Sequence, residues 1–329
     1  MKGLTDIEGL CVGHASDFEG ITGCTVVVCG PRGAVAGVDV RGSAVGEREL
    51  ETLRPGHLVE RVHAVVLAGG SAFGLEAAAG VMRYLEEQGI GFETGAARVP
   101  IVPAAILFDL AIGDARRRPD AAMGYEAAKT ASSAAVEEGS VGAGTGATVG
   151  KLLGVKHATK SGLGSTTIVL GSGVQVSALV VVNAFGDVRD PATGEILAGA
   201  RVGEKSAGFV DMVAQMKAGA SSSKFGAPAV PSSTTLAVVA TDARLDRLGA
   251  TKMAAMAQNG LARALAPVHT MFDGDIVFGL SVGEKQADVS TLGTAAAEAV
   301  AAAIVRAVEK ARSLGGIPAV TELKAFRVP

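Results

Sequence analysis

The sequence predicts an α/β fold whose sheets lie between layers of helix, and two patterns along the chain carry this prediction. The run 178–182 is continuously apolar, which is typical of a strand covered on both faces. Strands of this kind alternate with stretches of helical periodicity, so helices are expected to flank the sheets. The 329 residues are 48% hydrophobic, mostly Ala and Val, with 45 Gly and no Trp. This composition favours layers packed closely over small side chains, in one large domain or two ordinary ones.

The first half of the chain alternates short apolar runs with helical periods. The expected elements are strands at 25–28, 35–40 and 62–67 and helices at 75–85 and about 121–138. Gly89 is expected to stop the first of these helices. The apolar segment 99–112 contains two prolines, and proline cannot donate to a central ladder, so its regular part should begin after Pro103.

The second half predicts a hairpin and then strands that alternate with helices. The expected elements are strands at 166–170, 174–183, 234–242 and 276–282 and helices at 203–218, 245–265 and 289–314. The stretch 220–233 is rich in Ser, Gly, Ala and Pro and is interpreted as a flexible loop. Proteolytic cleavage concentrates in loops of this kind.

The most glycine-dense stretch, 139–151, resembles a phosphate-binding loop at first sight. A Walker A loop would need Gly where Thr145 stands and Ser or Thr where Leu152 stands, so the motif fails at two positions. Two interpretations remain. The stretch is a structural glycine turn, or it brings its backbone and Lys151 close to a reacting centre, as glycine permits.

Thr234 stands where the polar loop runs into an apolar, β-branched strand. The simplest interpretation is a good strand former at the start of a strand. A cut between Ser233 and Thr234 would instead leave one residue with a hydroxyl and a free α-amine, which is a nucleophile with its own base. The strand would hold that hydroxyl rigidly, because a β-branched side chain has few rotamers.

Four further residues are candidates for chemistry, each with an ordinary alternative. Asp273 and Asp275 form either an Asp-Gly-Asp turn or a pair of close carboxylates, of which one is kept protonated while the other orients a partner. Lys151 is either a solvated lysine or a buried cation that shuttles a proton. Asn183, at the end of an apolar strand, is either a turn former or a donor to a developing oxyanion.

Charge and composition argue against several classes of partner. The net charge of −3, with only the short basic cluster 116–118, predicts no nucleic-acid partner. The chain begins without an apolar signal segment and has no run of about 18 uninterrupted apolar residues, so a soluble, cytoplasmic protein without a membrane partner is expected.

The cysteines and histidines predict neither disulfides nor a metal site. The three cysteines are odd in number, lack CxxC spacing and are expected to be reduced thiols: Cys11, Cys24 and Cys29. The five histidines are scattered without the spacing of metal ligands. We expect no metal and no cofactor.

Motifs along nearly the whole chain resemble the N-terminal-nucleophile-like peptidase family. This family is typified by L-aminopeptidase/D-esterase, the β-aminopeptidases and the nylon-oligomer endo-hydrolase. The stretches that carry the resemblance are 12–14, 22–25, 39–42, 69–75, 142–146, Asn183, 234–235 and 240–242. The resemblance implies a four-layer αββα sandwich of the self-processing aminopeptidase type, without cofactor. It also implies one self-processing domain over 1–329, assembled as tetramers of αβ units or larger.

The resemblance also assigns roles to particular residues. It implies self-cleavage between Ser233 and Thr234 into an α chain, 1–233, and a β chain, 234–329, with Thr234 as nucleophile. Ser233 stands where relatives usually have Asn or Gly, and Phe108 where relatives have a tyrosine near the site. The remaining catalytic positions match the Thr-nucleophile, nylon-hydrolase branch: Lys151, Asn183, Asp273 and Asp275.

The sequence therefore predicts a self-cleaving amide hydrolase, with two alternatives. One is an acyltransferase of the ornithine acetyltransferase type, and the other is an uncleaved, non-enzymatic homologue. Small peptides, β-peptides, amino-acid amides and ω-amino-acid oligomers all qualify as substrates. Either the Thr234 amine or Lys151 would act as the base, and Asn183 would hold the oxyanion.

Overall fold

The computed structural model describes residues 1–204, 206–220 and 233–325, and it contains two large β-sheets. The six-stranded sheet runs in the order β12 (Leu163–Val169), β13 (Gln175–Asn183), β16 (Thr234–Ala243), β18 (Ile276–Lys285), β3 (Ala34–Val40) and β5 (Arg61–Val62). The five-stranded sheet runs in the order β1 (Cys11–Asp17), β2 (Thr22–Val28), β6 (Ala64–Ala68), β9 (Ala104–Ile106) and β4 (Glu47–Arg48).

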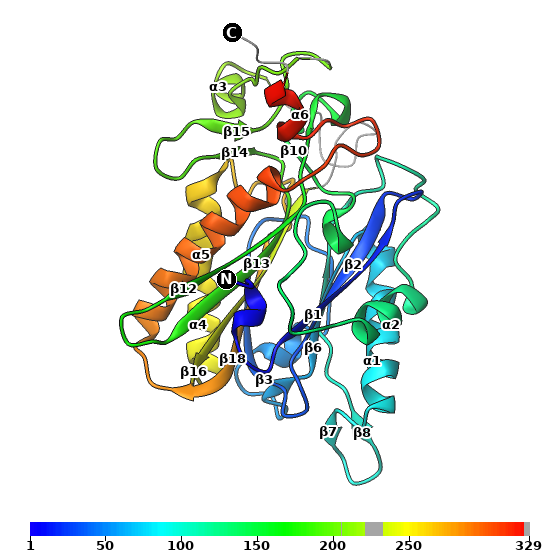
Figure 1. Ribbon diagram of the computed structural model, residues 1–329, viewed down its shortest axis with the longest axis vertical. Helices are drawn as coiled ribbons and strands as arrows, with labels where there is room; N and C mark the ends of the chain where they lie inside the picture. The colour runs from blue at the N-terminus through cyan, green and yellow to red at the C-terminus, as the bar shows by residue number, and fades with distance from the viewer. Residues whose placement is uncertain (205, 221–232, 326–329) are drawn as a thin grey trace.

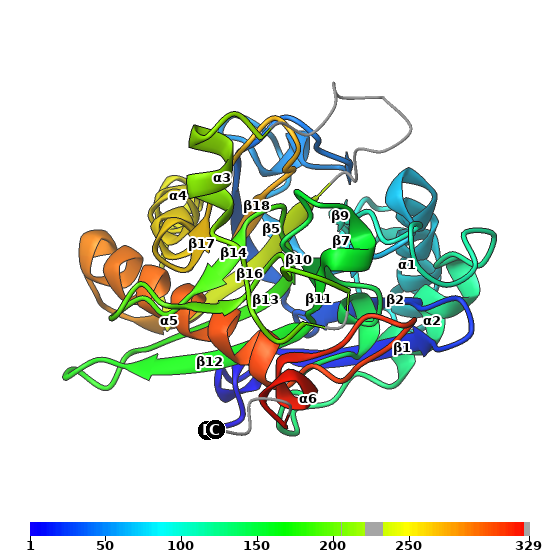
Figure 2. The same cartoon turned by 90° about the horizontal axis from the view of Figure 1, so that it is seen from above.

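Helices cover the outer face of each sheet, so the described chain has four layers (Figures 1 and 2). The helices α4 (Arg247–Ala264) and α5 (Val289–Glu309) pack on the six-stranded sheet. The helices α1 (Ala77–Glu87) and α2 (Ala121–Lys129) pack on the five-stranded sheet. This αββα sandwich confirms the predicted fold class.

Shorter elements complete the described chain. Three small sheets pair β7 (Phe92–Glu93) with β8 (Arg98–Val99), β10 (Thr148–Val149) with β11 (Thr159–Lys160), and β14 (Asp187–Arg189) with both β15 (Ile196–Ala198) and β17 (Leu265–Ala266). Two short helices are α3 (Met212–Lys217) and α6 (Val320–Ala325).

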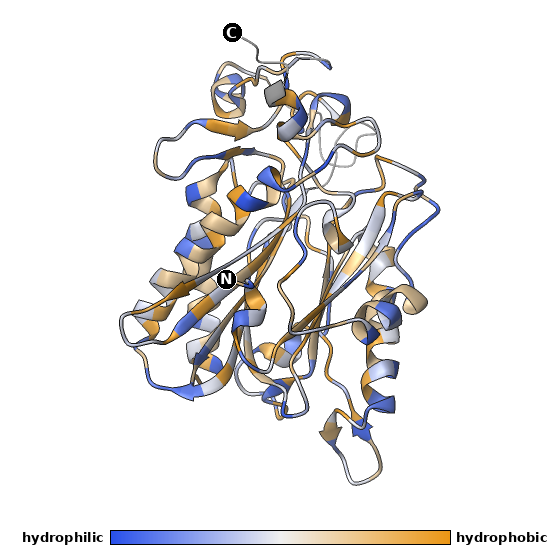
Figure 3. Cartoon of the chain, viewed as in Figure 1, coloured by the Kyte–Doolittle hydropathy of each residue, from blue (hydrophilic) through white to orange (hydrophobic). Residues whose placement is uncertain are grey.

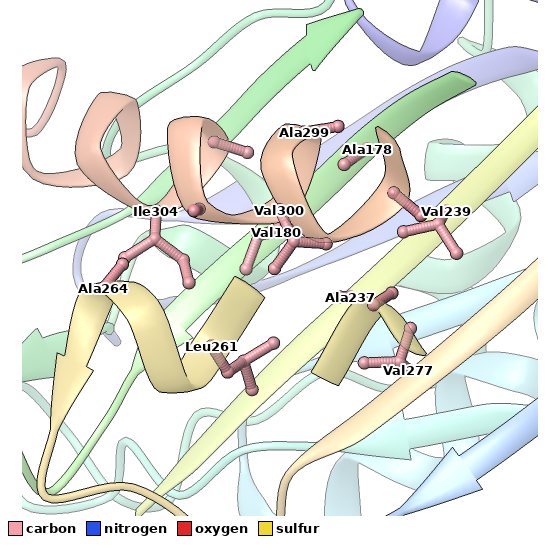
Figure 4. Packing of buried hydrophobic residues seen from close by; sticks show 14 of the residues in the cluster. Ala178, Val180, Ala237, Val239, Leu261, Ala264, Val277, Ala299, Val300 and Ile304 are labelled. Atoms are coloured by element: carbon pink, nitrogen blue, oxygen red, sulfur yellow. The ribbon is translucent and has the colours of Figure 1, made fainter. Parts of the chain in front are cut away.

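The alternation of side chains along β13 and β16 divides the core between two interfaces. Even-numbered residues of β13 and odd-numbered residues of β16, such as Val180 and Ala237, face α4 and α5, where they meet Leu261 and Val300 (Figure 4). Residues of the opposite parity, such as Leu236, face the other sheet. Because both faces are covered, these strands are hydrophobic along most of their length (Figure 3). Each buried Val or Leu contributes about 1.5–3 kcal/mol.

Four elements differ from the sequence prediction. The run 62–67 is not one strand, because the chain passes at His63 from β5 in one sheet to β6 in the other. The helix expected at 121–138 ends at Lys129, since the next segment bonds to the N-terminal region through Ser132 and Val136 instead.

The other two differences are also helices that are shorter than predicted. The helix expected at 203–218 is reduced to α3, which begins after the side-chain cap of Asp211. The helix expected at 289–314 ends at Glu309, and the chain just beyond it bonds to Ser140 through the backbone of Arg312. Most of the loop predicted at 220–233 lies outside the described residues.

Among the described helices, α5 alone is long and apolar enough to cross a membrane by length and composition. Of its apolar window, 67% is buried inside the protein. It packs against β12, β13 and α4, so its hydropathy is accounted for by core packing.

Candidate active site

The candidate residues meet where β13 ends and β16 begins. Asn183 is the last residue of β13 and Thr234 the first of β16, and the two are direct partners across the antiparallel ladder. Asn183 shares the parity of Val181 in β13 and Thr234 that of Leu236 in β16, so both belong to the face between the two sheets. The short strand β10, which precedes Lys151, lies beside β13 (Figure 2).

Three hydrogen bonds hold the backbone of Ser233 and the carbonyl group that it presents to Thr234. The Ser233 carbonyl oxygen accepts from the Thr234 hydroxyl at 2.6 Å and from the Gly274 amide at 2.9 Å. The Ser233 amide donates to the Phe272 carbonyl oxygen at 2.8 Å. Ser233 and Thr234 are both buried. The arrangement fixes this carbonyl and aims two donors at its oxygen, which polarises it for nucleophilic attack.

Lys151 is fully buried beside this peptide bond. Its Nζ donates at 2.8 Å to both the backbone oxygen and Oδ1 of Asn183, and it lies 3.4 Å from Ser233 Oγ. Burial lowers the pKa of Lys151 to about 7, against the charges of Asp273 and Asp109, which raise it. A lysine with this pKa can exchange a proton near neutral pH, as a general base must.

The Asn183 side chain is oriented by contacts at both ends. Its Oδ1 accepts from Lys151 and from the Thr148 amide at 3.1 Å, and its Nδ2 donates to the Phe108 carbonyl oxygen at 2.9 Å. An asparagine amide has two N–H donors, and the bond to Phe108 uses one of them. The second N–H is therefore a candidate oxyanion donor.

Asp273 and Asp275 are both buried, and both bind the backbone around the site. Asp273 accepts from the Phe185 amide at 3.0 Å and from the Thr270 hydroxyl at 2.6 Å. Burial and the neighbouring charge of Asp275 raise the pKa of Asp273 to about 6. Asp275 accepts from the Thr235 amide at 2.7 Å. Among the described residues, neither carboxylate bonds to the Thr234 hydroxyl, so their contacts orient the strand and loop around Thr234.

His269 belongs to the same cluster, although the sequence did not single it out. Its Nδ1 lies 2.7 Å from Asp275 Oδ2, and its backbone is left-handed with φ +54°. Asp275 thereby connects His269 to the Thr235 amide, next to Thr234. The sequence signal for this contact is the position of His269 six residues before Asp275 in one loop.

Replacing His269 by Ala should reduce amide turnover about ten- to a hundredfold, because it removes a hydrogen bond to the Asp275 carboxylate. Alanine also adopts a left-handed backbone poorly, whereas asparagine tolerates it and places an amide nitrogen near the Nδ1 position. His269→Asn should therefore retain more activity than His269→Ala. Equal steady-state rates for the two variants and the wild type would show that this contact is dispensable.

Other reactive side chains are poor candidates for the chemistry. Burial raises the pKa of Cys24 and of Cys29 to about 12, so both remain thiols at neutral pH. In the part of the chain that the structure describes, no three His, Cys, Asp or Glu side chains are grouped so as to hold a metal ion.

Comparison with known proteins matches nearly the whole chain to one family. A model of peptidase family S58 matches residues 2–321. The chain is 41% identical to an uncharacterized aminopeptidase of Mycobacterium leprae, with 97% of this chain and 93% of that protein covered. It is 31% identical to the 6-aminohexanoate-oligomer endohydrolase of Kocuria sp., with 85% of this chain and 74% of that protein covered.

Two solved structures share the fold at lower sequence identity. The β-aminopeptidase of Burkholderia sp. superimposes with a TM-score of 0.72 at 22% identity, covering 98% of this chain and 92% of that one. The L-aminopeptidase D-Ala-esterase/amidase of Ochrobactrum anthropi, a variant of the Ntn hydrolase fold, gives 0.71 at 20% identity, covering 96% and 88%. The four layers described above are thus a fold that this chain shares with both of these structures.

Proposed function

This chain belongs to peptidase family S58 and is an amide-bond hydrolase, and we propose that it cleaves itself before Thr234 and then uses Thr234 as its nucleophile. The observation that carries the proposal is the Ser233–Thr234 peptide bond. Its carbonyl oxygen accepts from the Thr234 hydroxyl and the Gly274 amide, with Lys151 beside it. A strand-bound threonine poised on its own preceding carbonyl is what self-cleavage requires.

In maturation, Thr234 Oγ1 attacks the Ser233 carbonyl carbon while neutral Lys151 accepts the hydroxyl proton. The Gly274 amide stabilises the oxyanion. The C–N bond then breaks, and the proton held by Lys151 passes to the departing Thr234 nitrogen, which leaves an ester between the two residues. Water hydrolyses this ester to a Ser233 carboxylate and a free Thr234 amine with its hydroxyl restored.

In turnover, the freed Thr234 hydroxyl attacks a substrate amide. When Ser233 leaves the site, Lys151 Nζ loses its contact with Ser233 Oγ. Either Lys151 or the new α-amine then takes the hydroxyl proton. The second N–H of Asn183 stabilises the oxyanion, the amine product leaves with the proton, and water hydrolyses the acyl-enzyme. Asp273 and Asp275 hold the surrounding backbone throughout.

The substrate class proposed is a small amide. Relatives include a protein named as an aminopeptidase and one named as a 6-aminohexanoate-oligomer endohydrolase, so aminoacyl-p-nitroanilides and a 6-aminohexanoate oligomer are the two substrates to compare first. We further propose that the protein is cytoplasmic and assembles as a tetramer of αβ units.

Denaturing mass spectrometry of the purified protein tests self-cleavage directly. Two fragments that end at Ser233 and begin at Thr234 are expected, and their masses should sum to that of the full chain plus one water. An intact chain that still hydrolyses amides would rule out the N-terminal Thr234 mechanism while leaving the family assignment in place.

A further inference from the structure

The glycine-rich stretch 139–151 is held together by a second buried lysine, Lys160. Its Nζ donates to three backbone carbonyl oxygens: Ser161 at 2.7 Å, Ala147 at 2.8 Å and Gly144 at 3.2 Å. A carbonyl oxygen can only accept, so three such bonds need three N–H donors. A neutral amine has two, and the site is therefore built for the ammonium form of Lys160.

A buried acid, Asp109, packs against the same stretch. Burial raises the pKa of Asp109, whereas the hydrogen bonds from Gly70 and Thr22 and the charge of Lys160 favour its carboxylate form. Its Oδ1 accepts from the Gly70 amide and its Oδ2 from the Thr22 hydroxyl, both at 2.7 Å. A Cβ added at Gly146 would lie 2.4 Å from Oδ2, so only glycine admits the carboxylate here. The next residue, Ala147, supplies one of the carbonyl oxygens that bind Lys160. Asp109 and Lys160 thus lie against adjacent residues of the stretch, Gly146 and Ala147.

Lys151, at the end of this stretch, has a different set of partners. Two of its contacts, both to Asn183, are to oxygens that only accept. The third is the Ser233 hydroxyl, which can donate or accept. Lys151 can therefore satisfy all three partners either as an ammonium or as an amine. A neutral Lys160 would leave one of its three carbonyl oxygens without a donor. Burial lowers the pKa of Lys160 to about 7 as well, against the charge of Asp109, which raises it. The hydrogen-bond partners therefore distinguish the two lysines: the first set suits a proton carrier, and the three carbonyl oxygens favour the cation.

We infer that Lys160 and Asp109 are positioning residues for Lys151: they hold the glycine-rich stretch in place, and their opposite charges set how readily Lys151 releases its proton. This inference rests on the proposed role of Lys151 as the base. It also assigns a function to the stretch that fails as a phosphate loop, namely to carry Lys151 to the candidate site while its carbonyl oxygens bind Lys160.

The direction of each charge effect follows from electrostatics. The charged groups that face Lys151 are the carboxylates Asp273 and Asp109, which favour its ammonium form, and Lys160, which disfavours it. Arg312 faces Lys160 in turn. Removing the negative charge of Asp109 should therefore make Lys151 lose its proton at lower pH, and removing the positive charge of Lys160 should have the opposite effect.

The pH dependence of kcat/KM on an aminoacyl-p-nitroanilide tests this, measured on self-cleaved, full-length protein. In Asp109→Asn the rising limb of the profile should move down by about one pH unit, and in Lys160→Met it should move up by about the same amount. The double variant should return towards the wild type. Asparagine suits the Asp109 site, because its oxygen can accept from Gly70 while its amide donates to the Thr22 hydroxyl.

Asp242→Asn is the matched control, since Asp242 lies near the far end of β16 in an ion pair with Lys285. Its profile should not move.

If Lys160→Met does not fold, as judged by its melting temperature, the direction of the Asp109→Asn shift decides. If the wild type shows a rising limb near pH 7 and Asp109→Asn leaves that limb in place or moves it to higher pH, the inference is overturned while the role of Lys151 as base stands. A wild-type profile with no limb near pH 7 overturns the role of Lys151 as base, and the inference with it.

Discussion

Thr234→Ala should remain a single chain of 329 residues and lose amide hydrolysis by at least about 10⁴-fold. The methyl side chain removes the oxygen that donates to the Ser233 carbonyl at 2.6 Å, so neither self-cleavage nor attack on substrate has a nucleophile. Denaturing mass spectrometry reads the first loss and steady-state hydrolysis the second. Because the change removes only a hydroxyl and a methyl group from a buried strand, the variant should still fold.

Two matched variants sharpen this test. Thr234→Ser keeps the hydroxyl, so it should still cleave and turn over, although more slowly because serine is held less rigidly at χ1. Thr235→Val keeps the strand and the backbone amide that Asp275 binds, and it removes a buried hydroxyl that has no hydrogen-bond partner in the described chain. It should be cleaved and active. Cleavage or turnover in Thr234→Ala would show that another residue is the nucleophile.

Lys151→Met should reduce turnover by about 10³-fold or more, because self-cleavage loses the acceptor of the Thr234 hydroxyl proton and, without self-cleavage, no free Thr234 amine forms to replace it. The base must be neutral to act, and the pKa of Lys151 is lowered to about 7 by burial, so wild-type kcat/KM should rise as pH increases through about 7. Lys151→Arg keeps the positive charge but cannot release a proton. An active Lys151→Arg variant would mean that charge, rather than proton transfer, is what the site needs.

The same pKa makes a prediction about stability, with the opposite dependence to that of a salt-bridged lysine. Between about pH 7 and the ordinary lysine value of 10.5, the unfolded chain binds the proton that the folded chain has lost, so the free energy of unfolding rises with pH. Burial also lowers the pKa of Lys160 to about 7, so both lysines contribute to this slope, and Lys151→Met should lose only the part that Lys151 contributes. Urea unfolding of the wild type and the variant at pH 7 and pH 9 measures the difference.

Local patterns were sufficient to predict the layered fold and to single out most of the residues that meet at the candidate site. Continuous apolar runs predicted β13 and β16, because a strand covered on both faces needs apolar side chains at every position. The change from polar loop to strand predicted where Thr234 stands. The structure also brings Lys151, Asn183, Asp273 and Asp275 to that point, as the resemblance implied.

Long-range packing decided what no local pattern contains. It divided 62–67 between two sheets at His63 and ended the helix after Lys129, because backbone groups there pair with distant segments. It also placed His269 on Asp275 and buried Lys151 against Asn183. The pKa of Lys151 depends on burial and on neighbouring charges, and both are decided by which residues meet in space. The groups around the Ser233–Thr234 peptide bond therefore come together only when the sheets have assembled.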